Sequence, residues 1–117
     1  MKETSYKNVP VDVLRFELEN SKANLKIAEQ SLDVVNEQIP YVVPMKRAFM
    51  ESHGGEDFDV ANLSYDDTMR WIRISDTADC LLADKSRLEE EIRHEANAID
   101  TYTAAIKKVV LKGREAK

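Results

Sequence analysis

The sequence predicts an all-α protein in which two long antiparallel helices form a hairpin or coiled coil. A connector with a short helix joins them, and a dimeric bundle is the expected assembly. Only three glycines and three prolines interrupt the 117 residues, so turns are few. Aromatic residues make up 7%, too few for the core of a sandwich or barrel. Apolar residues recur every three or four positions in two long segments, the spacing of one helix face. We treat residues 1–117 as a single helical domain.

The first predicted helix covers residues 10–39. Pro10 suits its first turn, because the backbone N–H that proline lacks has no partner there anyway. Pro40 is expected to end it, since the ring clashes with the preceding turn. Its predicted buried face is apolar at eight of nine positions: Val11, Leu14, Leu18, Ser21, Leu25, Ala28, Leu32, Val35 and Ile39. Such a narrow seam is typical of coiled coils.

Residues 40–63 are predicted to form the connector. Pro44 can open a short helix, and Gly54 or Gly55 can end it by adopting the left-handed conformation. The later stretch "DFDVANLSYDDT" superficially resembles a calcium-binding loop. It has Asn62 where an EF-hand requires glycine and Thr68 where it requires glutamate. No calcium site is therefore expected.

The second predicted helix covers residues 64–112. Ser64 can cap it, and Asp66 and Asp67 favour the positive end of its dipole. Ten of its twelve seam positions can be buried: Trp71, Ile74, Ala78, Leu81, Lys85, Leu88, Ile92, Glu95, Ile99, Tyr102, Ile106 and Val109. At about 1.5 Å per residue this helix is roughly 70 Å long, against about 45 Å for the first. Either a second copy covers the excess apolar stripe, or the helix bends near Asp76 and closes into a small bundle.

One pair of residues has the spacing of metal ligands. Glu91 and His94 share a helix face, as in the Glu-x-x-His half-site of di-iron bundles. Such a site needs two pairs and two further inward glutamates. The chain has one pair, although a homodimer could supply another, and Glu17, Glu29 and Glu37 all lie off the first seam. We therefore expect a solvated or partner-facing boundary here, with no metal or other cofactor.

Catalytic groups are equally sparse. Cys80 stands beside Leu81 at the edge of the second seam, and a free cysteine usually behaves as a small hydrophobe. No glycine-rich phosphate loop is present in the sequence. The chain is therefore not expected to be an enzyme.

The net charge of −5 argues against direct binding of nucleic acid or of anionic lipid. The first ten residues have no apolar stretch like that of a signal peptide, and no segment is long and apolar enough to span a bilayer. The single cysteine is compatible with a reducing compartment. We expect a soluble, cytoplasmic protein.

The best functional prediction is a non-enzymatic protein-binding module that acts as an adaptor, chaperone or inhibitor. Small acidic helical proteins of this kind are common among bacterial and phage accessory proteins, which is an association only. Trp71 can pack in the core, or with Arg70 and Arg73 it can form a binding hot spot. The predicted homodimer seam lies around Ile92, Ile99, Tyr102 and Ile106.

The alternative is a nucleic-acid mimic that blocks a DNA- or RNA-binding protein. Residues 50–67 contain six acids and no lysine or arginine. The mimic would place its acids in the basic groove of the target, and the candidates are Glu56, Asp57, Asp59, Asp66 and Asp67. On the long helix, by contrast, interleaved lysines and arginines dilute the negative charge.

Overall fold

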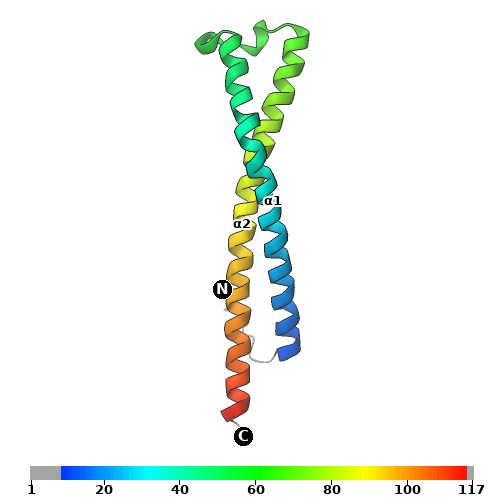
Figure 1. Cartoon of the computed structure of the whole chain (residues 1–117), viewed down its shortest axis with the longest axis vertical. Coiled ribbons are helices and arrows are strands. Elements are labelled where there is room, and N and C mark those ends of the chain that lie inside the picture. Colours follow the sequence, from blue (N-terminus) through cyan, green and yellow to red (C-terminus); the bar gives the residue numbers. More distant parts are fainter. Residues whose placement is uncertain (1–8, 116–117) are drawn as a thin grey trace. The chain divides into compact units, whose positions relative to one another are not determined.

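The computed structural model describes the backbone of residues 9–115 and the side chains of residues 9–113. Its elements are, in order, helix α1 (Val11–Ser52), the 3₁₀ turns η1 (Gly55–Asp57) and η2 (Val60–Asn62), and helix α2 (Tyr65–Glu115) (Figure 1). The described residues contain no strand, and the two long helices pack against each other as a helical hairpin. The all-α prediction is confirmed.

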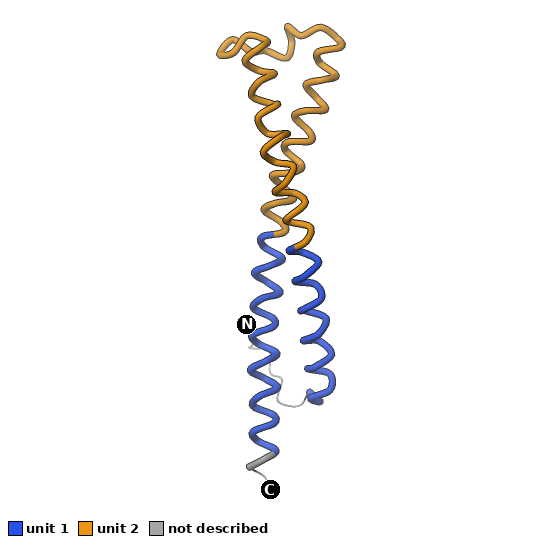
Figure 2. Tube along the Cα trace, viewed as in Figure 1, with its two compact units in different colours: residues 1–29, 89–117 blue, residues 30–88 orange. Residues whose placement is uncertain are grey.

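The chain divides into two compact units, each containing a segment of both helices (Figure 2). Unit 1 comprises residues 1–29 and 89–117, and unit 2 comprises residues 30–88. The two units are described separately below.

Helix α1 does not end at Pro40, as predicted, but continues through Pro40 and Pro44 to Ser52. The predicted separate short helix is therefore the last part of α1. Both prolines are exposed, so the carbonyl groups that lose their amide partners can bind water instead. The apolar seam also continues beyond Pro40, with Val42 half-buried and Phe49 buried. We attribute the continuation to this burial, which opposes the roughly 3 kcal/mol cost of an internal proline.

The predicted seam of α1 is confirmed position by position. Leu14, Ser21, Ala28 and Val35 are buried, and the five seam residues between and beside them are half-buried. Leu14 is only 1% exposed. The three-and-four spacing thus identified the face of α1 that packs on α2.

Helix α2 begins as predicted and is longer than predicted. The Ser64 hydroxyl accepts a hydrogen bond from the Asp67 amide at 3.2 Å, which caps the first turn. All twelve predicted seam positions are buried or half-buried, whereas the neighbouring Leu82 is 45% exposed. The helix is unbroken at Asp76 and reaches Glu115.

The connector proper is short and starts with two glycines. Gly54 and Gly55 have φ angles of 117° and 58°, the left-handed region predicted for the end of the helix. Asp59 then caps η2 by accepting a hydrogen bond from the Ala61 amide at 3.0 Å. This connection belongs entirely to unit 2.

The extension of α1 changes the predicted difference in helix length. Helix α1 has 42 residues and α2 has 51, or about 63 Å and about 77 Å. The difference in helix length falls from about 25 Å to about 14 Å, so only part of the excess length that suggested a homodimer disappears. Within residues 9–115, neither helix contains an apolar stretch long enough to cross a membrane.

Candidate functional site

The end of unit 2 near the connector is organised around an aromatic cluster. Phe49, which is buried, lies 5.7 Å from the Trp71 ring and 6.2 Å from the Phe58 ring, measured between centroids. Phe58 and Trp71 are themselves 4.7 Å apart. The Lys46 ammonium lies 5.8 Å from the centre of the Trp71 ring and 3.1 Å from the Asp79 carboxylate. Trp71 is therefore half-buried among intrachain partners, as in the core-packing alternative.

His53 connects the two helices of unit 2 beside this cluster. Its ring stacks on Phe49 at 4.0 Å, and its Nε2 lies 3.3 Å from an oxygen of Asp67 in the first turn of α2. The Asp67 partner of His53 could not be identified from sequence spacing, because it is fourteen positions away across two glycines. The contact helps to hold the start of α2 beside the end of α1.

The same corner brings together serine, histidine and aspartate, as a catalytic triad does. The Ser52 hydroxyl lies 2.9 Å from Nδ1 of His53, and both groups lie within 3.0 Å of the Phe49 carbonyl oxygen. A carbonyl only accepts hydrogen bonds, so the Ser52 hydroxyl donates its hydrogen to Phe49. That hydrogen therefore does not point at Nδ1 of His53, as the serine hydrogen of a catalytic triad points at its base. The arrangement ends a helix and does not activate a nucleophile.

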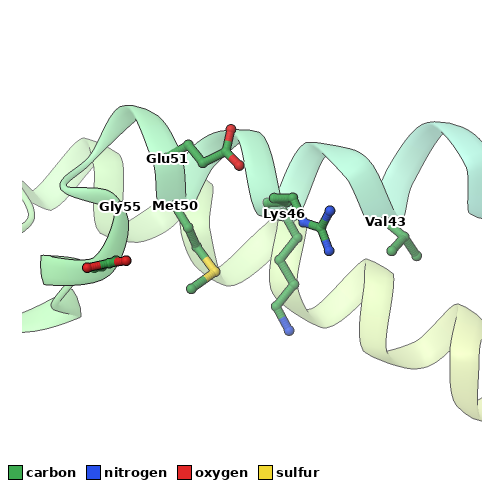
Figure 3. Close-up of a pocket in the computed structure, with 7 residues that line it drawn as sticks. Val43, Lys46, Met50, Glu51 and Gly55 are labelled. Carbon is green, nitrogen blue, oxygen red and sulfur yellow. The ribbon is translucent and has the colours of Figure 1, made fainter.

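A shallow open groove of about 530 Å³ lies along the last turns of α1 in unit 2 (Figure 3). Helix α1 lines it with Val43, Lys46, Arg47, Met50 and Glu51, and η1 contributes Gly55 and Glu56. Figure 3 shows the labelled side chains Val43, Lys46, Met50 and Glu51 projecting from one helix, with Gly55 in the turn after it. Two cations and two carboxylates balance each other around the groove, so its charge selects no particular ligand.

The predicted acidic patch is only partly available at the surface. Glu56, Asp57, Asp59 and Asp66 are exposed. Asp59 caps its own turn, however, and Asp67 is half-buried between His53 and Arg70, whose guanidinium lies 3.9 Å away. The remaining carboxylates lie on the connector and the first turn of α2.

The predicted dimer residues lie in unit 1 and face its own α1 segment. Ile92, Ile99, Tyr102 and Ile106 are all half-buried seam positions. Glu91 and His94, the pair with metal-ligand spacing, are exposed. Cys80 of unit 2 is also exposed, so its expected place at the edge of the core is wrong.

The predicted hot-spot arginines are exposed, but their apolar neighbours are not those expected from the sequence. Tyr65, Met69 and Ile72 occupy the outer face of α2 in unit 2, and Tyr65 is 78% exposed. Arg73 lies on the same face by its spacing of four from Met69. Trp71 points to the cluster instead.

A second apolar stripe on α1 was not predicted from the sequence. In unit 1 the exposed residues are Val13, Phe16 and Ile27, and in unit 2 they are Val34, Tyr41 and Met45. Val13, Ile27, Val34 and Tyr41 are separated by multiples of seven, with Asn20 at the intervening position. These positions lie on the side of α1 opposite its seam. Because several of these positions are separated by multiples of seven, the stripe could have been recognised from the sequence.

Glu95 is an exception within the seam of unit 1. Its Oε2 is the one buried side-chain oxygen or nitrogen among the described residues that has no hydrogen-bond partner. Removing an unsatisfied buried acceptor restores the free energy lost in its desolvation. We expect Glu95→Leu to raise the free energy of unfolding by about 1–2 kcal/mol in urea titrations. Glu89→Leu, at an exposed position nearby, should change it by less than about 0.5 kcal/mol; equal effects of the two would count against this role of Glu95.

Comparison of the chain with known protein families, with curated proteins and with solved structures finds no match.

Proposed function

We propose that the protein is a non-enzymatic binding module that recognises another protein through exposed faces of its helices. The observation that carries this proposal is the stripe on the outer side of α1. Exposed apolar residues scattered singly over a surface are ordinary, whereas aligned ones mark interaction sites. Phe16 and Ile27 are 64% and 61% exposed, and both lie on the side away from the seam.

The biological role consistent with such a surface is that of an adaptor, chaperone or inhibitor. Each acts by occupying or presenting a surface and needs no reactive group. In the Ser52–His53–Asp67 group, the Ser52 hydroxyl donates its hydrogen to the Phe49 carbonyl and not to His53. An origin among bacterial or phage accessory proteins stays part of the proposal by association alone.

The proposal predicts position-dependent cross-linking in the native cell. A photo-reactive amino acid at Ala23, exposed at the centre of the unit 1 part of the stripe, should cross-link a partner protein. The same group at Asn97, exposed on α2 of unit 1, should not. Phe16→Ser should abolish the Ala23 product by removing the largest apolar contact. Identical products from both positions, or none from Ala23, would contradict binding through this stripe.

The mimic of nucleic acid is the weaker proposal. It requires a dense, free array of carboxylates, and Asp59 and Asp67 are engaged in local contacts. The predicted homodimer also remains a proposal. The difference in helix length that suggested a homodimer is smaller than predicted, because α1 extends to Ser52. Sedimentation of the wild-type chain at micromolar concentration tests the homodimer directly.

A further inference from the structure

We propose that the outer face of α1 in unit 1 docks a helix of another protein that has an apolar stripe in heptad spacing and basic flanking residues. This inference rests on the proposed protein-binding function and specifies the partner. The face consists of Val13, Phe16, Asn20, Ala23 and Ile27, and all five are exposed. They belong to the segment of α1 that lies in unit 1 (Figure 2).

The spacing of the face indicates that its occupant is a helix. The five positions step by three, four, three and four residues, the repeat that keeps two helices in contact over several turns. The same repeat on the opposite side of α1 already packs against a helix, namely α2. A strand repeats every two residues and would leave this stripe within one turn.

Two residues within the face constrain the partner further. Ala23 is small and leaves room for a large side chain of the occupant to fit between Phe16 and Ile27. Asn20 is the one polar member, and a polar residue at a single core position favours one register, in which a polar partner lies opposite. The occupant is therefore an amphipathic helix with one polar interruption in its stripe.

Charge at the edges of the face indicates the flanking residues of the occupant. The positions that border the stripe on its two sides carry the carboxylates of Asp12, Glu17 and Glu19 and the single ammonium of Lys26. Glu19 contacts Lys22 at 3.4 Å, but both side chains are more than half exposed, and such a pair is weak. Three carboxylates against one ammonium favour lysine or arginine beside the apolar stripe of the partner.

In a parallel pairing, a second copy of the chain is a poorer occupant of this face. Such a pairing would bring Asp12 of one copy next to Glu17 of the other, because these facing edge positions are five residues apart. Like charges in those positions destabilise a pair of helices. The like charges count against parallel self-pairing, and the excess of carboxylates at the edges favours a basic helix.

The test uses the chain of 117 residues and two synthetic peptides of four heptads. Both have isoleucine and leucine in the core positions and one core asparagine; one has lysine at all flanking positions, the other glutamate. Fluorescence anisotropy should show the lysine peptide binding at least about tenfold more tightly, since several exposed ion pairs of a few tenths of a kcal/mol sum to about that ratio. Raising the salt concentration to 0.5 M should reduce the difference.

Variants locate the bound peptide. Phe16→Ser with Ile27→Ser should abolish binding of the lysine peptide, whereas Val34→Ser with Tyr41→Ser, on the same helix in unit 2, should leave it within about twofold. Glu17→Lys with Glu19→Lys should reverse the preference between the peptides. Circular dichroism verifies that all variants keep the helix content of the wild type, as substitutions on the exposed side should.

Several results would overturn the inference. Equal binding of both peptides removes the charge requirement, and binding unaffected by Phe16→Ser with Ile27→Ser places the peptide elsewhere. A wild-type dimer dissociated by Ile27→Ser would identify a second copy as the occupant. If neither peptide binds while Ala23 still cross-links a cellular partner, the proposed function stands and the basic helix is wrong. If Ala23 gives no partner either, both fail.

Discussion

Replacement of Phe49 by alanine is expected to lower the free energy of unfolding of unit 2 by about 3–5 kcal/mol. Phe49 is 8% exposed and contacts the rings of His53, Phe58 and Trp71, so its removal leaves a cavity among side chains of the connector and α2. Trp71 is the one tryptophan in the chain, and its fluorescence therefore reports this unit specifically. Urea titrations followed by that fluorescence measure the change.

The chain offers a matched control for this substitution. Phe16→Ala removes the same side chain from the same helix at an exposed position and should change stability by less than about 0.5 kcal/mol. A loss of less than 1 kcal/mol in Phe49→Ala would mean that the cluster does not hold the ends of α1 and α2 together in solution.

The second large effect is expected from Ile99→Asp. Ile99 is half-buried in the seam of unit 1, and a carboxylate placed there without a partner should cost several kcal/mol. Circular dichroism should show loss of helix at lower urea concentrations than in the wild type. If unit 2 does not depend on unit 1, the Trp71 fluorescence transition should shift less than the helix transition.

Sedimentation of the same variant tests the predicted homodimer. If Ile99 packs only within its own chain, wild type and variant are both monomers and the variant is the less stable. If Ile99 belongs to a seam between two copies, the wild type sediments as a dimer and the variant as a helical monomer. Ile27→Asp places the same charge at an exposed position of α1 and should leave the stability almost unchanged.

Part of the candidate site was predictable from particular residues. Trp71 was recognised as the residue with two possible roles, and Gly54 and Gly55 as the end of a helix. The partners of Trp71 were not predictable, because Phe49 reaches it from α1 and Phe58 from the connector. His53 and Asp67 likewise meet only because the two left-handed glycines turn the chain back.

The sequence alone could not show which of the two apolar faces of α1 is exposed. Its sevenfold spacing is present in the sequence, but the seam from Val11 to Ile39 has the same spacing and more apolar positions. Only one of the two faces can pack on α2, and burial identifies the one that does. The other face stays exposed and is therefore a candidate surface for binding a partner.

By itself, the sequence determined the helical class, the seam of each helix and the start of α2, because each depends on local spacing or on a cap within four residues. Only the tertiary structure decided where α1 ends. Local chemistry favours a stop at Pro40, but both prolines lie on the exposed side of a helix whose opposite face continues to pack as far as Phe49. An apolar face that is buried along a partner helix can keep a chain helical where a proline alone would end it, since the energy of burial accumulates over several residues and the defect is local.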